Sequence, residues 1–448
     1  MKKKSYFCNM NRIVFSSFGT AFLLFAMALP ALVSAQELQL SSVRNCDSIL
    51  SIRHDDGPRF VSQDLPILYD EPDNWRSELK NDDNYPIEWQ LEHGRRHTWR
   101  LGVDVATFLR DAAFSLPYTR GYTATGFFVT PYAKHLIGSD AQMTFGVHLA
   151  GVAGYKGFHS WKPLVRLEYE PFNNVRLVMG SLYGCLSHGL FEPMLDRERY
   201  IYDHYEEGVQ LLADMPLTQG DKANIRLKTD TWLHWEELLE PWQPTQERFT
   251  LGSSNILQLL GTASNTQRGW SLSIPFSFLG SHRGGQFTAL DTCIQSLFNE
   301  NVGLRLDFAL DYDNAFALDM PLFFYQDISP EKHQAYDKGW GLWPQVSYDH
   351  LISKKQHAPY RGSWRLLAQA GYWYGYQYIA PRGSYLFQSV SWHKDYFAVP
   401  EREMVTAKLA LENRYKNHFA LGLDAECYYD LRERGLDFAF GLYLRYKM

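Results

Sequence analysis

Apolar side chains occupy every second position of the C-terminal segment 435–448. The positions between them are small, polar or charged. The apolar positions are Leu436, Phe438, Phe440, Leu442, Leu444, Tyr446 and Met448. Because successive side chains of a β-strand point to opposite faces, this segment is predicted to be a strand with one continuously apolar face.

The same alternation recurs along most of the chain. It is found in the segments 99–107, 162–170, 223–235, 269–279, 302–312, 363–378, 403–415 and 417–429. Most of these are longer than the ~5–6 residues of soluble strands and suit the ~9–11 residues of a tilted membrane strand. Tyr and Trp stand near the ends of the apolar faces, and charges of both signs stand on the polar faces. We therefore expect an all-β, antiparallel, up-and-down transmembrane β-barrel rather than a soluble sandwich.

The composition excludes several other classes of protein. Aromatic residues make up 15% of the 448-residue chain, more than one ordinary soluble core requires. A share of 45% apolar and 21% charged residues excludes a disordered chain. The mean hydropathy of −0.33 argues against a bundle of membrane helices. A net charge of −6 argues against a nucleic-acid partner.

The first 35 residues are predicted to be a cleaved signal peptide. Lys2, Lys3 and Lys4 precede an apolar run over 13–29, and small residues up to Ala35 form a cleavage site. Residues 36–96 are polar and contain several Pro and Asp residues. We expect them to form an irregular periplasmic segment or a plug in the lumen, and residues 97–448 to form the barrel.

The last strand resembles that of bacterial outer-membrane β-barrel proteins. In that family, apolar residues alternate back from an aromatic last residue. Phe440, Leu442, Leu444 and Tyr446 match this assembly signal, and Met448 stands where Phe or Trp is usual. The resemblance implies export, the barrel-assembly machinery as a partner, and an outer membrane whose lipid surrounds the barrel in a Gram-negative cell. The high aromatic content is similar to that of porin-like proteins of Bacteroidota-type bacteria.

About sixteen strands are predicted, with fourteen to eighteen as alternatives. Their approximate ranges are 97–108, 122–134, 140–153, 161–171, 173–184, 205–215, 221–235, 268–280, 285–298, 300–312, 314–325, 341–351, 362–378, 402–414, 417–429 and 434–448. With a periplasmic C-terminus, the periplasmic turns are 171–174, 280–285, 311–314 and 415–417. The long connections 185–204, 236–267, 326–340 and 379–401 then face outward, as bacterial barrels prefer.

A barrel of this size encloses an aqueous channel unless something fills it. Charges on the polar faces would line that channel, or would only pair with one another across strands. They are Arg100, Asp104, Arg166, Glu168, Arg226, Lys228, Arg305, Asp307, Lys408, Glu412, Asp424, Glu426 and Asp437. Trp232, Trp373, Tyr428 and Tyr443 face the same way. They could stack on sugar rings, although we favour packing against a plug.

The function expected from these features is passive diffusion of small hydrophilic solutes through a porin-like channel, without enzymatic activity, cofactor or metal. The alternative is a plugged barrel that binds a glycan or a partner at the cell surface. A third hypothesis is an outer-membrane hydrolase, because Ser187 and His188 stand in a polar loop. Neighbouring residues of a strand point apart, which argues against this pair. The sequence leaves the solute and the oligomeric state open.

Overall fold

The computed structural model describes most of residues 99–447. The gaps in the description are 138–139, 155–159, 173, 184–187, 202–204, 219–224, 239–245, 262–267, 285–293, 312, 353–363, 392, 395–396 and 416–418. The predicted signal peptide, the segment 36–96 and Met448 lie outside the described residues.

The described chain is almost entirely β-strand. Its strands are β1 (Trp99–Ala113), β2 (Tyr122–Ile137), β3 (Ala141–Val152), β4 (Ser160–Phe172), β5 (Val175–Ser181), β6 (Glu207–Pro216), β7 (Arg226–Glu237), β8 (Arg248–Gly261), β9 (Gly269–Arg283), β10 (Gln295–Ala309), β11 (Asn314–Asp327), β12 (Lys338–Leu342), β13 (Gln345–Ile352), β14 (Trp364–Tyr376), β15 (Glu401–Tyr415), β16 (Phe419–Asp430) and β17 (Gly435–Lys447). Short 3₁₀ turns cover Arg197–Ile201 and Tyr385–Phe387. Among these residues no helix is long and apolar enough to cross a membrane.

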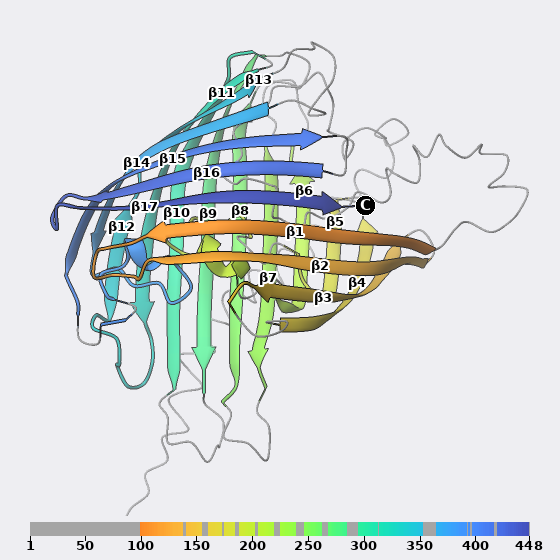
Figure 1. Ribbon diagram of the computed structural model, residues 1–448, viewed down its shortest axis with the longest axis horizontal. Helices are drawn as coiled ribbons and strands as arrows, with labels where there is room; N and C mark the ends of the chain where they lie inside the picture. Colours follow the sequence, from red (N-terminus) through yellow and green to blue (C-terminus); the bar gives the residue numbers. More distant parts are fainter. Residues whose placement is uncertain are drawn as a thin grey trace, which may run out of the picture. The chain divides into compact units, whose positions relative to one another are not determined.

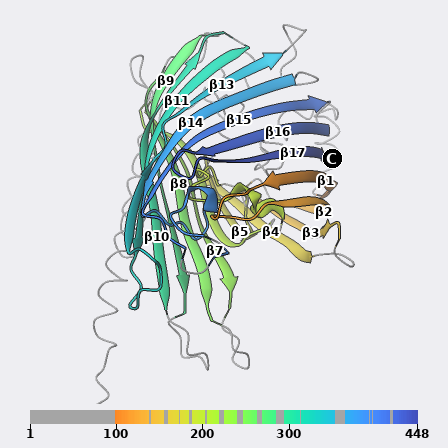
Figure 2. The same cartoon turned by 60° about the vertical axis from the view of Figure 1, so that its left-hand side comes forward.

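The strands form one closed antiparallel barrel. Apart from β12 and β13, each strand pairs with its neighbours in sequence, and β17 pairs with β1 to close the wall (Figures 1 and 2). β12 and β13 both lie between β11 and β14, so the seventeen strands fill sixteen positions. Pro344 lies in the break between them and cannot donate a main-chain hydrogen bond. The predicted fold class is confirmed.

Two of the predicted strand boundaries are wrong, and the two errors cancel in the strand count. The predicted loop 236–267 contains β8. The ranges 285–298 and 300–312 are not two strands, because the single strand β10 runs through Asn299, Glu300 and Asn301. The amides of Asn299 and Asn301 are buried on the inner face, and Asn299 donates to the carbonyl oxygen of Ile379. In the sequence this polar stretch is typical of a turn. In the structure it is part of a strand, and Asn299 and Asn301 face the lumen.

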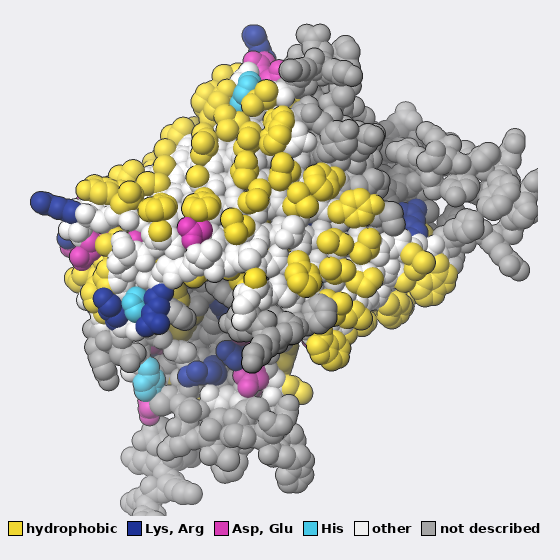
Figure 3. Space-filling model, in the orientation of Figure 1, with side chains coloured by type: hydrophobic (Ala, Val, Ile, Leu, Met, Phe, Trp, Pro, Cys, Tyr) yellow, Lys and Arg dark blue, Asp and Glu magenta, His cyan; other side chains and the backbone are white. Residues whose placement is uncertain are grey.

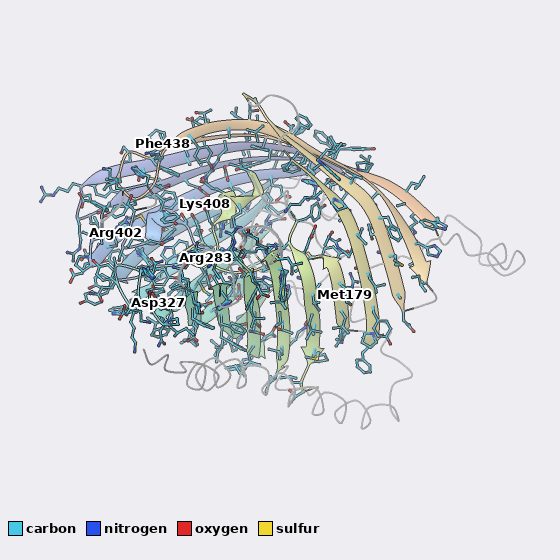
Figure 4. All side chains as sticks on the ribbon, turned by 90° about the horizontal axis from the view of Figure 1, so that it is seen from below. Met179, Arg283, Asp327, Arg402, Lys408 and Phe438 are labelled. Carbon is cyan, nitrogen blue, oxygen red and sulfur yellow. The ribbon has the colours of Figure 1, made fainter. Side chains whose placement is uncertain are left out.

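The outer face of the wall is apolar, as alternation predicts. Leu436, Phe438, Phe440, Leu442, Leu444 and Tyr446 are all more than one third exposed, whereas Asp437 and Ala439 are buried. Figure 3 shows hydrophobic side chains spread over this face, and in Figure 4 Phe438 lies at the outer edge of the wall and Lys408 inside it. An apolar exterior around a polar interior is the organisation of outer-membrane barrels.

The two ends of the barrel differ in the length of their connections. β1 begins and β17 ends at the same end, because Asp104 pairs with Lys447. That end carries short connections such as 310–313, whereas 182–206 and 377–400 lie at the other end. Bacterial barrels keep short turns in the periplasm, so the long connections face outward. The predicted turn 280–285 is misplaced, since β9 ends at Arg283 at the outer end.

Two of the outer connections fold back and pack inside the barrel. Leu190, Phe191, Met194 and Leu195 come from 182–206, and Tyr378, Ile379, Leu386 and Phe387 from 377–400. They form one buried cluster with inward residues of the wall: Val178, Trp232, Leu279, Leu297, Phe323, Trp373, Met404 and Tyr428. The connections also bond each other, because the Ser384 N–H donates to the Glu192 carbonyl at 3.1 Å. We call these two connections the plug.

Candidate functional site

The inward charges largely neutralise one another. Arg305 donates to Asp307 and Asp319 across β10 and β11, and Arg226 pairs with Asp214. Arg110 pairs with Glu198 of the plug and with Asp424 and Glu426 of β16. Further predicted lumen residues are also engaged: Asp104 with Arg445, Arg166 with Ser181, Glu168 with Arg176, Lys408 with Glu426, and Asp437 with Ser115.

The remaining predicted lumen charges differ from one another in how far they are exposed. Glu412 is buried, Arg100 is half-buried and Lys228 is exposed. A role for any of these charges in transport stays a prediction.

The inward aromatic rings are covered. Trp373 is fully buried and packs against Phe323, Tyr378 and Phe387. Tyr428 donates to Glu192 of the plug at 3.0 Å, and Tyr443 is buried beside Asp424. The His188 ring stacks on Trp232 with centroids 3.7 Å apart. In this arrangement these four predicted sugar-stacking rings face plug or wall rather than open solvent.

His188 is fixed between two carboxylates. Its Nδ1 lies 2.9 Å from Asp230 Oδ2, and its Nε2 lies 3.2 Å from Glu206 Oε2. Burial lowers the pKa of His188, but the charges and hydrogen bonds of Asp230 and Glu206 outweigh this and raise it to about 9. A protonated ring with both nitrogens engaged cannot act as a general base near neutral pH. Its predicted partner Ser187 lies outside the described residues.

A second histidine, on β3, contacts a hydroxyl group inside the barrel. His148 Nδ1 lies 2.7 Å from Thr130 Oγ1, and both side chains are buried on the inner face. Tyr205 packs edge-on against the ring, with centroids 4.9 Å apart. Because this pair faces the lumen and not the lipid, it is poorly placed for chemistry on a membrane lipid.

A third histidine has the geometry of a general base. His282 of β9 faces Ser296 of β10, with Nδ1 2.8 Å from Oγ. Its Nε2 lies 2.9 Å from the carbonyl oxygen of Gly284. A carbonyl oxygen only accepts, so we assign the proton to Nε2, which leaves Nδ1 to accept from the Ser296 hydroxyl. The arrangement joins a nucleophile, a base and a group that orients the base.

The backbone holds the two side chains together. The Ser296 N–H donates to Ser329 Oγ at 2.9 Å, and the Ser296 carbonyl accepts from the Ile328 N–H at 2.9 Å. Both main-chain groups therefore point toward β11. On its other side Ser296 forms the narrow type of cross-strand pair with His282, in which Cα atoms approach to about 4.5 Å. We call His282 and Ser296 the rim dyad.

The rim dyad lies on the outer face of the wall at the outer end of the barrel. Ser296 shares its face with Val302 and Leu304, which are exposed, whereas Ser296 itself is only 6% exposed and His282 is half-buried. His282 continues a row of rings across the wall, with centroids 5.0 Å from Phe249, which lies 5.6 Å from Trp235. Aromatic rings of this kind mark the membrane interface. The dyad therefore lies beside aromatic rings at the outer end of the wall.

Sequence reasoning missed the rim dyad. Ser296 and His282 are 14 positions apart, and only the register of β9 with β10 places them opposite each other. The prediction instead placed a tight periplasmic turn at 280–285 and so assigned the wrong end of the barrel to His282. No group of His, Cys, Asp and Glu among the described residues is arranged to hold a metal ion.

One protein-family model matches most of the chain. A family model described as lipid A 3'-O-deacylase-type matches residues 91–448. The comparison with curated proteins gives no match. Because the matching family is an enzyme family, the expectation that this protein is not an enzyme is wrong. His282 and Ser296 escaped notice because only the register of β9 with β10 places them opposite each other.

Solved outer-membrane proteins resemble the chain only distantly. An OmpT loop-deletion mutant of Vibrio cholerae has 10% identity and a TM-score of 0.43, covering 78% of this chain and 99% of its own. OprB of Pseudomonas putida has 8% identity and a TM-score of 0.45, covering 83% and 97%. OprD of Pseudomonas aeruginosa has 10% identity and a TM-score of 0.42, covering 78% and 95%. Similarity at this level says nothing about activity.

Proposed function

The chain belongs to the lipid A 3'-O-deacylase-type family, and on that premise we propose that it is an outer-membrane esterase that removes an acyl chain from lipid A or a similar acylated glycolipid. Ser296 is the nucleophile and His282 the general base. The observation that carries this proposal is the hydrogen bond of 2.8 Å between their side chains on the lipid-facing wall.

The reaction proceeds in two halves. Ser296 Oγ attacks the ester carbonyl carbon while His282 Nδ1 takes the hydroxyl proton. Collapse of the tetrahedral intermediate breaks the bond to the sugar oxygen, which receives the proton from His282 and leaves as an alcohol. Water then gives a proton to His282 and attacks the acyl-serine. The second collapse restores the Ser296 hydroxyl and releases the fatty acid.

The location of the rim dyad suits a lipid substrate. The ester bonds of a glycolipid lie between its polar head group and its acyl chains, and the rim dyad lies at the corresponding level of the wall. Exposed apolar residues below it, such as Val302 and Leu304, provide a surface for an acyl chain. His148 and His188 lie inside the barrel and meet neither condition.

Passive diffusion through the lumen has less support as the main function than ester hydrolysis at the rim dyad. The plug fills the outer part of the barrel with buried apolar side chains, and the inward charges are largely paired. The fold is porin-like, but side chains of the plug are buried against inward residues of the wall. Conductance of the native protein, compared with that of Arg402→Met, tests whether the plug closes the lumen.

The proposal is tested by expressing the protein in a Gram-negative host and measuring the mass of its lipid A. The native chain should remove one acyl chain. Ser296→Ala should abolish the change, and His282→Gln should slow it by about 10²–10⁴-fold. Gln keeps a donor for Gly284 but cannot take up the proton. Ser277→Ala, on the inner face of the same strand β9, is the matched control and should retain activity.

Two results would contradict the assignment. Full activity of correctly assembled Ser296→Ala would exclude this nucleophile. Loss of activity in Ser187→Ala, with Ser296→Ala active, would place the chemistry in the outer connection instead. Heat-dependent gel mobility separates both results from a failure to fold.

A further inference from the structure

Two carboxyl groups and one phenol meet where the plug contacts β16. The hydroxyl oxygen of Tyr428 on β16 lies 3.0 Å from Oε1 of Glu192 on the plug. The same oxygen lies 3.3 Å from Oε2 of Glu426 on β16. All three side chains are buried, so each polar group depends on hydrogen bonds within the protein. We call Glu192, Tyr428 and Glu426 the plug junction.

The plug junction is one hydrogen short when both carboxyl groups are ionised. The Tyr428 hydroxyl carries a single hydrogen, so it can donate to only one of them. When it donates to Glu192, its oxygen faces a Glu426 oxygen without a hydrogen between them, and two buried acceptors in contact are unfavourable. A proton on Glu192 removes this conflict. Glu192 then donates to Tyr428, and Tyr428 donates to Glu426.

The nearby cations decide which of the two carboxyl groups takes the proton. Arg110 of β1 donates to Glu426 Oε2 at 2.5 Å, and Lys408 of β15 donates to Glu426 Oε1 at 2.6 Å. Figure 4 shows Lys408 inside the barrel. Each oxygen of Glu426 therefore accepts from a charged donor, which favours its ionised form. The proton belongs on Glu192.

The other charged groups near Glu192 act in both directions. Burial, followed by the negative charge of Glu426, raises the pKa of the Glu192 carboxyl group. The positive charges of Arg197 and Lys408 and the hydrogen bond from the phenol lower this pKa by less. Asp196 is a further acidic group on the plug, and burial raises its own pKa to about 6. The balance of these groups favours the neutral form of Glu192.

We propose that the plug junction is a proton-binding site and that the plug docks with a proton on Glu192. In an undocked plug, Glu192 meets water and has an ordinary pKa of about 4.3. Because docking raises this pKa, the proton stabilises the docked plug fully below about pH 4, and this contribution is lost as pH rises through the raised value. Between the two values the docking equilibrium constant falls by up to about tenfold for each pH unit.

Infrared spectroscopy of the full-length protein tests the proton directly. At pH 7 a carboxyl group with an ordinary pKa is ionised, whereas a protonated carboxyl group gives a separate C=O band. Glu192→Gln should remove the intensity of one protonated carboxyl group from the native spectrum. Glu237→Gln, which removes an exposed carboxylate paired with Arg248 at 2.8 Å, is the matched control and should keep this intensity. Heat-dependent gel mobility shows whether each variant is folded.

Amide protection factors of 188–201, corrected for the intrinsic exchange rate, report on docking. Other titrating groups of the plug add to the pH dependence of the native protein, so the informative quantity is the difference between native protein and Glu192→Gln. Between pH 5 and 7 the protection factors of Glu192→Gln should fall less steeply, by up to about tenfold for each pH unit. The Gln amide keeps a hydrogen for Tyr428 and cannot lose it. Glu237→Gln should keep the native slope.

Three results would overturn the proposal. The first is an unchanged carboxylic acid band in Glu192→Gln, which would place the proton elsewhere. The second is the same pH slope in native protein and Glu192→Gln, and the third is an equal change in Glu237→Gln. Because neither measurement uses a lipid substrate or the rim dyad, failure of the proposed esterase activity would leave these outcomes unchanged.

Discussion

Arg402 of β15 holds the plug in the barrel, and its replacement should open the lumen. Its guanidinium donates to the carbonyl oxygens of Gln388 and Leu386 at 2.8 and 2.9 Å, and to Asp430 at 3.1 Å. Arg402 and Asp430 are both buried. Arg402→Met preserves most of the volume but leaves the Asp430 carboxylate and two carbonyl groups without this donor.

The expected cost is large. Removing one partner of a buried, hydrogen-bonded ion pair costs about 3–5 kcal/mol. At about 1.4 kcal/mol for each factor of ten, the undocked population of connection 377–400 should rise by about 10²- to 4 × 10³-fold. In planar bilayers the native protein should be silent or open rarely, whereas Arg402→Met should open often.

Two controls make this experiment decisive. Arg432→Met removes an exposed arginine from the same end of the barrel, and it should behave like the native protein because exposed ion pairs contribute ~1 kcal/mol or less. A chain without residues 36–96 should stay silent if the connections alone close the lumen. Steady native channels that Arg402→Met leaves unchanged would refute the reasoning that the plug closes the barrel.

Other predictions concern the plug and the wall. The raised pKa of His188 stabilises the docked connection 182–206 below about pH 6.5, and this contribution, on the order of 3 kcal/mol, is lost as pH rises through about 9. The protection factors of amides in 188–201, which are corrected for the base-catalysed intrinsic rate, should therefore fall between pH 7 and 10, and His188→Gln should flatten this profile. Gly252→Leu should push away the Trp232 ring, which lies 2.3 Å from the position of an added Cβ, and lower the thermal unfolding midpoint by the equivalent of about 1–3 kcal/mol. Leu442→Arg places a charge against lipid and should impair assembly by about 2–4 kcal/mol, whereas Leu442→Phe should assemble, as heat-dependent gel mobility would show.

The sequence predicted the barrel because alternation reports directly which face of a strand meets lipid. It failed at β8, where the outer face carries Ser253 and Asn255 instead of apolar residues. Thr231 and Thr229 of β7 hydrogen-bond these two side chains at 2.7 Å each, so polar groups on the lipid side satisfy one another. Such pairing depends on register, and alternation within a single strand cannot reveal it.

The candidate site was less accessible to sequence reasoning than the fold. The rim dyad requires the register of two strands and the correct end of the barrel, and both depended on the connection after Arg283. The plug raises a similar difficulty. Leu190, Phe191 and Met194 look like ordinary loop residues until the opposite wall supplies Trp373 and Tyr428 to pack against. Contacts between distant segments follow from the closed wall and not from local pattern.

The position of Arg110 also bears on how the protein is built. Arg110 stands on β1, its partner Glu426 on β16, and its other partner Glu198 in the connection between β5 and β6. The first and last strands must meet before one guanidinium can reach both carboxylates. Arg110 thus joins the connection 182–206 to both sides of the seam, so docking of this connection and closure of the wall stabilise each other. A chain whose first and last strands have not met lacks the contact of Arg110 with Glu426, whereas pairs between neighbouring strands, such as Arg305 with Asp319, do not depend on closure.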